Sequence, residues 1–476
     1  MRRLAGTAAA AAALVVVPAA FAGEAVLFAP PPAWVLPAPA PDSAGTAPAH
    51  TAIPLYDVQT LIDGETVTAF KDGAVTIASP EMLNQLGTIA LSWQPAHGDL
   101  VVHAAQILRG GKMIDILKGG GNQFSVLRRE ARLEQKIVDG TLTAVMQVPG
   151  LAVGDVLRVS HSVTTTDKAL GGMAQAGLAL VPRPVTMHYG RARLVWPERQ
   201  PIAWKALMPG VTAQPRSIGG GRRELTVMLP TARLPELPAA TPARFHALAV
   251  IEASSFADWQ GVARVMAPHY RTQGAITEGS ELARMVDAIA SAHADPVARM
   301  AEALRVVQGD VRYQLIALGS GNYVPQSPDE TWRQRYGDCK AKTLLLLAML
   351  DRMGIAAEAV LVSTRLGDMV PQRLPAAMAF DHVIVRATAG GESFWLDGTS
   401  TGGRLADIRD TPRFGWVLPV RENGAALERI VPRANARPGV NLRVDYDLGA
   451  SIHLPVPFTM QLRLTGPQAE QARTIG

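Results

Sequence analysis

The stretch from Ser327 to Gly354 constrains the fold of this chain most, because it places a cysteine at the start of an apolar helix. Its sequence is SPDETWRQRYGDCKAKTLLLLAMLDRMG, and Cys339 is the only cysteine in 476 residues. The opening serine, followed by proline and then by Glu330 three residues later, is typical of a helix N-terminus. Gly337 predicts a break, and Asp338 then caps a second helix that ends at the final glycine.

The position of Cys339 favours a reactive thiol. In the first turn of a helix, unpaired backbone N–H groups and the helix dipole stabilise a thiolate. The rest of this helix is predicted to be buried on most sides because it carries a run of leucines, namely Leu344, Leu345, Leu346, Leu347 and Leu350. Free cysteines are also common as small hydrophobic core residues. Taken alone, the cysteine therefore leaves a structural role open.

Two downstream strands supply the partners that a nucleophilic cysteine needs. FDHVIVRA (380–387) predicts a strand that His382 enters, and FWLDGTS (394–400) predicts a strand that ends at Asp397, with a Gly390-Gly391 turn between them. Alone, each is also typical of an ordinary strand or turn residue. Together they predict a Cys-His-Asp triad in which the imidazole lies within about 4 Å of both partners. We expect His382 and Asp397 to share the sheet face that meets the start of the cysteine helix.

These segments resemble the bacterial transglutaminase-like superfamily. The resemblance covers roughly residues 290–400 and rests on YGDCKAK with its apolar helix, MGIAAEAVLVSTR, FDHVIVRA and FWLDGTS, in that order. It implies a papain-like arrangement with Cys339 as nucleophile, His382 as base and Asp397 as the carboxylate that orients the base. Many relatives carry an acidic residue where this chain has Ala341, which affects the expected local ion pairing but not the triad.

An oxyanion hole requires donors beside the nucleophile. Trp332 and Gln326 lie close in sequence to Cys339 and are the candidate side-chain donors, to act with the Cys339 backbone N–H. Trp332 is equally typical of an aromatic residue in a core or a cleft wall.

Length and composition indicate a globular protein of two or three domains. Charged residues make up 18% and apolar residues 48% of the chain. The formal net charge of +5 is scattered, and no basic run with interleaved aromatic residues predicts nucleic-acid binding. The glycine triplets at Gly119 and Gly219 are not followed by Lys-Ser/Thr, so they do not predict a phosphate loop. We predict no cofactor and no metal.

The first residues predict export. Residues 1–22 have a basic start, an apolar middle and a small-residue end at Ala20-Phe21-Ala22, typical of a secretory signal peptide. The expected location is the periplasm or the cell envelope. No other window is long and apolar enough to span a bilayer, so we predict no transmembrane helix in the mature chain. Residues 23–54 are rich in alanine and proline and are interpreted as a linker.

The predicted fold class is multidomain α+β. Short strands with glycine turns predict a β-sandwich over residues 55–245, which is similar to the uncharacterised β-rich module that often precedes transglutaminase-like cores. Helices and then strands follow in a papain-like/transglutaminase-like core over 250–425. Residues 436–476 predict two strands, the start of a C-terminal β module. This pair either packs back on the body or belongs to a longer protein.

The predicted function is that of an exported cysteine-dependent acyl transferase or amide hydrolase acting on protein or peptide amides. With water as acceptor the protein is a peptidase or amidase, our first interpretation; with a lysine-like amine it is a cross-linker. The alternative is a catalytically silent envelope scaffold that keeps the fold. In either case the β-sandwich is a candidate contact for an envelope polymer or a partner protein.

Overall fold

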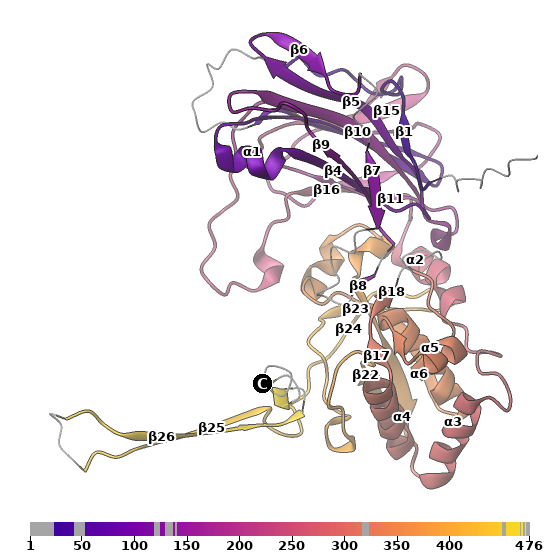
Figure 1. Ribbon diagram of the computed structural model, residues 1–476. Helices are drawn as coiled ribbons and strands as arrows, with labels where there is room; N and C mark the ends of the chain where they lie inside the picture. Colours follow the sequence, from indigo (N-terminus) through magenta and orange to yellow (C-terminus); the bar gives the residue numbers. More distant parts are fainter. Residues whose placement is uncertain are drawn as a thin grey trace, which may run out of the picture.

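The computed structural model describes residues 23–41, 53–118, 124–128, 137–138, 140–316, 323–449, 454–466, 468–469 and 472. The predicted signal peptide lies outside the described residues. Figure 1 shows a strand-rich N-terminal lobe, a second lobe that contains the longer helices, and a hairpin that projects from the second lobe. The protein is thus a mixed, strand-rich multidomain chain with several sheets.

A nine-stranded sheet forms the frame of the N-terminal lobe. Its order is β1-β5-β10-β3-β2-β12-β15-β14, and β6 pairs with β5. The strands are β1 (Val26–Phe28), β2 (Ile53–Asp63), β3 (Thr66–Thr76), β5 (Leu100–Arg109), β6 (Lys112–Asp115), β10 (Val156–Thr166), β12 (Met187–Pro197), β14 (Arg216–Ile218) and β15 (Arg222–Met228). Gly110 and Gly111 form the turn between β5 and β6, since Arg109 pairs with Lys112 across it.

Two three-stranded sheets lie against one face of this large sheet. One contains β4 (Thr88–Trp93), β9 (Leu142–Gln147) and β7 (Ser125–Arg128); the other contains β11 (Gln175–Ala179), β16 (Val250–Ser254) and β13 (Ala203–Ala206). Trp93 packs with Ile107 in the first interface, and Leu178 packs with Leu194 in the second. A short helix, α1 (Pro80–Leu86), precedes β4 and is capped by Ser79. The alternation of apolar and polar residues along each strand produces this layering.

Two predicted boundaries need correction. Within the predicted linker, Val26–Phe28 form β1, which pairs in parallel with β5, and the carbonyl of Gly23 accepts a hydrogen bond from the Trp93 indole at 2.6 Å. The described part of that stretch therefore belongs to the N-terminal lobe. At the other end, β16 pairs with β11 and β13, so the lobe extends past the predicted limit at residue 245. Backbone pairing between distant strands decided both boundaries, and local composition does not reveal it.

The second lobe places helices against a five-stranded sheet. The helices are α2 (Trp259–Met266), α3 (Glu281–Ala292), α4 (Pro296–Asp310), α5 (Pro328–Gln334) and α6 (Cys339–Arg352). The sheet order is β22 (Glu392–Leu396), β21 (His382–Ala389), β20 (Ala356–Val362), β23 (Trp416–Pro419), β24 (Glu428–Arg429). Two pairs of short strands are also present, each parallel: β17 (Arg312–Tyr313) with β19 (Tyr336–Gly337), and β18 (Leu315–Ile316) with β8 (Ile137–Val138) from the first part of the chain.

Helix α6 is the centre of the second lobe. Leu345, Leu346, Met349 and Leu350 are fully buried, in a core that also receives residues of α2, α3, α4 and the sheet. Its N-terminal half is tied to the sheet by the Thr343 hydroxyl, which donates to the Val383 carbonyl at 3.0 Å. A helix buried on all sides has little freedom to shift, so the position of its first residue is well fixed.

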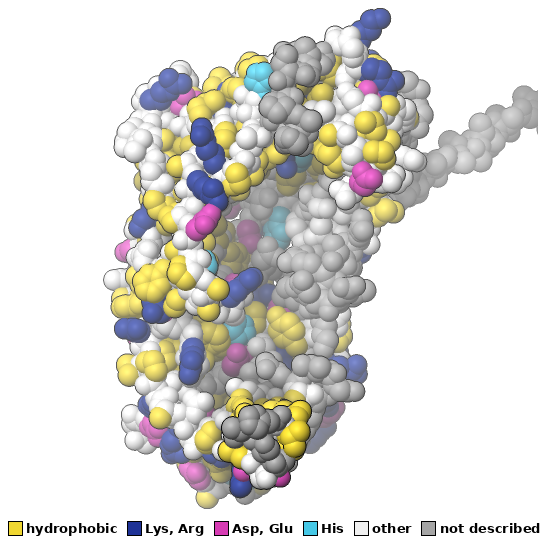
Figure 2. All heavy atoms as spheres, turned by 90° about the vertical axis from the view of Figure 1, so that its left-hand side faces the viewer, with side chains coloured by type: hydrophobic (Ala, Val, Ile, Leu, Met, Phe, Trp, Pro, Cys, Tyr) yellow, Lys and Arg dark blue, Asp and Glu magenta, His cyan; other side chains and the backbone are white. Residues whose placement is uncertain are grey.

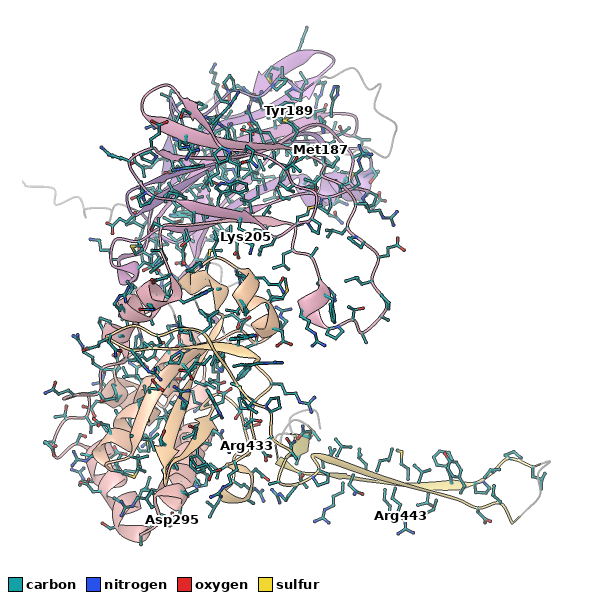
Figure 3. All side chains as sticks on the ribbon, turned by 180° about the vertical axis from the view of Figure 1, so that it is seen from behind. Met187, Tyr189, Lys205, Asp295, Arg433 and Arg443 are labelled. Atoms are coloured by element: carbon teal, nitrogen blue, oxygen red, sulfur yellow. The ribbon has the colours of Figure 1, made fainter. Side chains whose placement is uncertain are left out.

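The C-terminal strands form an isolated hairpin. β25 (Val440–Tyr446) and β26 (Phe458–Leu464) pair only with each other, and the hairpin extends away from the body (Figure 1). Leu442, Phe458 and Met460 are 55%, 62% and 59% exposed. Figure 2, which faces the hairpin end-on, shows hydrophobic side chains gathered there, and Figure 3 places Arg443 on it well away from the core. The described strands therefore do not pack back on the body.

No helix among the described residues combines the length and the hydropathy needed to cross a membrane.

Truncation of a leucine in α6 tests the role of this helix. Leu346→Ala is expected to lower the free energy of unfolding by about 2–5 kcal/mol, because it opens a cavity in a fully packed core. The measurement is urea denaturation followed by circular dichroism. Leu405→Ala, at a site 49% exposed, is the control and should change the value by less than about 0.5 kcal/mol. Equal effects of the two substitutions would contradict the central role of α6.

Candidate active site

Cys339 is the first residue of α6, as the sequence predicts. Asp338 caps the helix, since its Oδ1 accepts from the Ala341 N–H at 2.9 Å. Lys340 pairs with the other oxygen of Asp338, so this buried carboxylate has a cationic partner even though position 341 is not acidic. Gly337 is required on steric grounds, because a Cβ there would lie 2.9 Å from the Ala341 Cβ. The thiol is free and 9% exposed.

His382 and Asp397 meet as predicted. The imidazole Nε2 lies 3.0 Å from Asp397 Oδ2, within hydrogen-bonding distance. Cys339 is near enough to the same imidazole to raise the pKa of His382. Because Nε2 faces the carboxylate, Nδ1 is the ring nitrogen left for the sulfur. The structure thus brings the three predicted residues together through a single ring.

Strand pairing explains how residues 15 positions apart come to touch. β21 and β22 pair antiparallel around Gly390-Gly391, from Ala389 opposite Glu392 to Val385 opposite Leu396. Continued regularly, this register would set His382 opposite Thr399. The chain instead leaves the ladder after Leu396 and turns back, which absorbs the stagger and brings Asp397 to the ring. A matched register plus one turn is sufficient to form the pair.

The expected sheet face is wrong. Along β21, Val383 and Val385 pack in the core that contains α6, whereas Ile384 packs in a separate cluster on the other face. His382 lies two residues before Ile384, so both side chains are on the same face of β21. The His382 ring makes an edge contact with Phe414, which packs against that second cluster. The imidazole therefore reaches Cys339 around the end of the strand. Side-chain alternation fixes the face, and only the position at the strand terminus allows this contact.

The electrostatic setting holds the imidazole in its cationic form. Burial alone would lower the pKa of His382, but hydrogen bonds to Asp397 and Cys339, with their charges, outweigh burial and raise it from 6.5 to about 10. Burial likewise opposes ionisation of Asp397, yet the bonds from His382 and Thr399 keep the pKa of this carboxyl below its usual value. At neutral pH the ring is positive and the carboxylate negative. A cationic imidazole beside a cysteine stabilises the thiolate.

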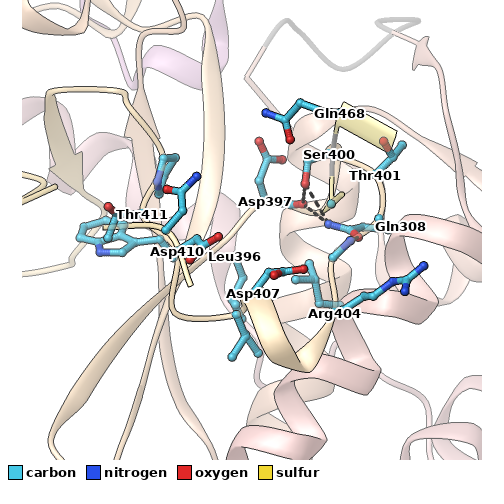
Figure 4. Close-up of a pocket in the computed structure, with 18 of the residues that line it drawn as sticks. Gln308, Leu396, Asp397, Ser400, Thr401, Arg404, Asp407, Asp410, Thr411 and Gln468 are labelled. Atoms are coloured by element: carbon cyan, nitrogen blue, oxygen red, sulfur yellow. Dashed lines mark hydrogen bonds between the residues drawn. The ribbon is translucent and has the colours of Figure 1, made fainter. Parts of the chain in front are cut away.

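Thr399 and Gln308 were not identified from the sequence. The Thr399 hydroxyl and N–H both donate to Asp397 Oδ1, at 2.7 and 2.8 Å. Gln308, on α4, donates to the Asp397 carbonyl and to Ser400 Oγ, both at 2.9 Å (Figure 4), and accepts from the Gly403 N–H. The sequence Asp-Gly-Thr is typical of a turn in which the aspartate side chain accepts from the backbone N–H two residues later, so the contact with Thr399 could have been predicted. Gln308 offered none, because tertiary packing alone brings α4 to this loop.

Lys342 is a second charged group inside the site. Its ammonium donates to the Val311 carbonyl at 2.6 Å and its side chain is 2% exposed. Burial lowers its pKa to about 8, against the opposing influence of the Asp397 charge. The side chain crosses beneath the Asp397 turn, since the Lys342 Cβ lies 3.4 Å from where a Cβ on Gly398 would stand. A Cβ at position 398 would be closer still to Val307 Cγ1, at 3.0 Å, so the turn packs tightly against both α4 and α6.

The two oxyanion candidates differ in their bonding. The Gln326 amide donates to Gln334 and accepts from Thr331, each at 2.9 Å, so it is engaged in a local network. The Trp332 indole N–H is buried and has no hydrogen-bond partner, while its ring stacks beneath the Arg335 guanidinium at 3.5 Å. Of the two, Trp332 keeps a donor that is not already used.

Two cavities lie near the candidate residues, although Cys339 itself lines neither of them. One of about 420 Å³ opens beside Asp397 and is lined by Ser400, Arg404 and Phe414 among others (Figure 4). The other, of about 410 Å³, opens at the start of α6 and is lined by Asp338, Gln326 and Tyr336 among others. Among the described residues, no three acidic, histidine or cysteine side chains are grouped to hold a metal.

Comparisons with known proteins agree with this architecture. A family described as a domain of unknown function with a solved structure, DUF3857, matches residues 64–230, within the N-terminal lobe. The crystal structure of a protein from Parabacteroides distasonis, described as "a putative protease", has a TM-score of 0.62 and 15% identity, over 84% of this chain and 78% of that one. At this identity the likeness establishes the fold alone.

A second solved structure is less similar. A "putative cysteine protease" from Cytophaga hutchinsonii matches 62% of this chain and 89% of its own with 12% identity, but its TM-score of 0.23 is too low to support an argument. No curated protein matches the sequence. The described residues therefore define a strand-rich, multidomain protein with the fold of the Parabacteroides protein and a buried Cys-His-Asp cluster in its second lobe.

The pKa of His382 predicts how stability depends on pH. Because the folded-state value of about 10 exceeds the usual 6.5, His382 contributes its full stability below about pH 6.5 and loses it as pH rises through 10. The difference in unfolding free energy between the wild type and His382→Ala should thus shrink from pH 6 to pH 10. Lys342, whose pKa is lowered, acts in the opposite sense above about pH 8 in both proteins and cancels. A difference independent of pH would contradict the ion pair.

Gln308 provides a test of positioning. Gln308→Leu removes the donor to the Asp397 carbonyl, so the carboxylate should turn more freely and the pKa of His382, followed by NMR, should fall toward 6.5. Thiol alkylation should slow about tenfold at pH 7, since fewer rings are cationic. Arg305→Gln, on the same helix but in a surface ion pair with Glu302, is the control and should change neither quantity. An unchanged His382 titration would assign Gln308 a packing role only.

Proposed function

We propose that this protein is a cysteine-dependent acyl transferase or amide hydrolase of the transglutaminase-like type, acting through a Cys339 thioester on protein or peptide amides. The observation that carries the proposal is the imidazole of His382, which is hydrogen bonded to Asp397 at 3.0 Å and has its pKa raised by both Asp397 and Cys339. A thiol with a base, and a base with an orienting carboxylate, are the parts that covalent catalysis by cysteine requires.

In the proposed reaction, the Cys339 thiolate attacks the amide carbonyl carbon and forms a tetrahedral oxyanion. The Cys339 backbone N–H, at the start of α6, supplies one donor to this oxyanion, and the Trp332 indole N–H is the candidate second donor. The His382 imidazolium then gives its proton to the leaving amine as the carbon–nitrogen bond breaks. The thioester remains on the sulfur, and Asp397 holds the ring in the orientation that both proton transfers need.

The acceptor determines the type of enzyme. Neutral His382 takes a proton from water or from an amine as this nucleophile attacks the thioester, and the thiolate leaves. Water gives a peptidase or amidase, which we propose first, and a lysine-like amine gives a cross-linker. The cavities beside Asp397 and at the start of α6 support a substrate larger than a single amide group, such as a peptide.

We further propose a papain-like core for the second lobe, a β-sandwich for the N-terminal lobe, and location in the periplasm or cell envelope. The support for these points is the order of Cys, His and Asp on helix and strands, the stacked sheets around their apolar clusters, and the signal-like first 22 residues. The C-terminal hairpin, with its exposed apolar side chains, supports the start of a further β module.

The second candidate is a scaffold that keeps the fold without turnover. Its support is the burial of the site, since the thiol is 9% and the imidazole 9% exposed, so a substrate needs some rearrangement to reach the sulfur. Loops and lids that move during the reaction cycle give substrates access to enclosed sites in many enzymes. The distinction between enzyme and scaffold is therefore a matter of chemistry at the thiol.

Alkylation and acylation of the native protein test the enzyme. Iodoacetamide should modify Cys339 at pH 7 much faster than a model thiol, because the cationic His382 favours the thiolate. The activated ester p-nitrophenyl acetate should acetylate the same residue, identified by mass spectrometry of the peptide containing it. Cys339→Ser should abolish both reactions and lower the melting temperature by less than about ten degrees. Modification seen only after denaturation would favour the scaffold.

The contribution of Asp397 is tested by Asp397→Asn. The substitution keeps the size of the side chain but removes the charge that holds the imidazolium, so alkylation and deacylation should slow by about a hundredfold or more. Asp381→Asn is a matched control: Asp381 precedes His382 directly, but its carboxylate bonds Thr364 at 2.7 and 2.8 Å, away from the ring. Rates reduced equally in both variants would argue against an orienting role for Asp397.

A further inference from the structure

The open face of the nine-stranded sheet carries a buried polar row. Two sheets cover the opposite face, but on this one three ion pairs cross the strands: Arg158 with Asp72, Arg191 with Asp57, and Arg193 with Glu224, at 2.6–2.7 Å. Asp57 and the Gln59 beside it are fully buried. Buried ion pairs add little stability compared with apolar residues of the same size. Their retention here calls for another reason.

The remaining donors of this polar row bind the main chain of one segment. Leu36 donates its N–H to Gln59 Oε1 at 3.0 Å and accepts at its carbonyl from Gln59 Nε2 at 2.7 Å. The Leu36 carbonyl also accepts from Arg191 at 2.6 Å, and the Trp34 carbonyl accepts from Arg193 at 2.8 Å. His103 lies 2.8 Å from the Ala29 carbonyl. The sheet therefore binds main-chain groups of the segment, and at Leu36 it binds both the N–H and the carbonyl.

The side chains of this segment contribute little to its hold. Leu36 is 39% exposed although both of its main-chain groups are bound, and most residues from 29 to 40 are exposed. Ala38 is the exception and packs on a small cluster with Leu55 and Tyr189, the latter labelled in Figure 3. Binding through main-chain hydrogen bonds, with the side chains exposed to solvent, depends on the extended conformation of the peptide more than on its particular residues.

The segment does not fill the space beneath it. A cavity of about 360 Å³ remains between residues 31–38 and the sheet, and the sheet side is lined by Phe70, His103, Gln106 and Ser160 among others. An integral strand of the domain would be expected to pack against its neighbours without such a gap. The segment crosses this groove in the way that a bound peptide does.

The sequence of the segment suits this mode. Residues 29–41 read APPPAWVLPAPAP, in which proline fixes the backbone near the extended conformation, so little conformational entropy is lost on binding. Proline has no N–H, and the sheet binds the N–H groups of Ala29 and Leu36, both non-proline positions. We propose that this groove is a binding site for extended proline-rich segments of partner proteins, and that residues 29–38 are its intramolecular occupant.

The test releases the occupant after folding. A protease site is inserted within residues 42–52 of the full chain, the folded protein is cut, and a fluorescein-labelled synthetic peptide of residues 29–41 is added. Fluorescence anisotropy should show the peptide binding to the cut protein and displacing the original segment. Before cutting, binding should be about a hundredfold weaker, because the tethered segment competes at a millimolar effective concentration.

Matched peptides test the backbone-reading mode without altering the protein. N-methylation of Leu36 in the peptide removes the N–H bound by Gln59 and should weaken binding at least tenfold. Leu36→Ala in the peptide keeps both main-chain groups and should bind within about twofold, since that side chain points outward. An equal loss from the two peptides would overturn backbone recognition.

Other outcomes bear directly on the proposal. If the cut segment stays in place for a day against a large excess of peptide, or if its release melts the β signal in circular dichroism, the segment is an integral strand and the proposal fails. If cutting produces a dimer that exchanges segments and excludes the free peptide, the occupant is a second copy, and the proposed partner class is wrong. Iodoacetamide labelling of Cys339 is measured in parallel and should be unchanged, so this test is independent of the proposed enzyme.

Discussion

The hydrogen bond between His382 and Asp397 is the interaction on which the site depends. It exists because an antiparallel ladder ends at Leu396 and the chain then turns, held by Thr399 and by Gln308 from α4. Without the carboxylate, burial would lower the pKa of the imidazole, and the ring would be neutral beside the thiol. The same bond therefore orients the ring and contributes to its positive charge.

Burial in the second lobe supports this arrangement mechanically. Helix α6 fixes the cysteine because the helix is surrounded by core residues and because Thr343 bonds the strand that carries the histidine. Lys342 adds a contact between α6 and the turn at Gly398. The cost is a buried lysine whose pKa falls to about 8. The Lys342 contact helps to fix the distance between Cys339 and Asp397, because it joins the helix that carries the cysteine to the turn that carries the carboxylate.

The N-terminal lobe uses buried charge for a different purpose. Arg191 and Arg193 are neutralised by carboxylates, and each still has a donor that reaches a main-chain carbonyl. In the second lobe the charge of Asp397 acts on the side chain of His382. In the N-terminal lobe the charged side chains of Arg191 and Arg193 bind main-chain carbonyl groups. Both lobes thus recognise extended chain, one by contacts with its backbone and the other, as proposed, by reaction at an amide.

Local sequence was sufficient for the helix caps at Ser327 and Asp338 and for the Gly390-Gly391 turn, because each depends on neighbours in the chain. The choice of Cys339, His382 and Asp397 combined three separate segments with a family resemblance, and the structure brings these residues near one another. Tertiary structure alone decided the sheet face of His382, the role of Gln308 and the attachment of residues 23–41. In each of these cases the partner lies on a distant segment. Periodicity and turn chemistry report the conformation of a segment, but they carry no information on which other segment packs against it.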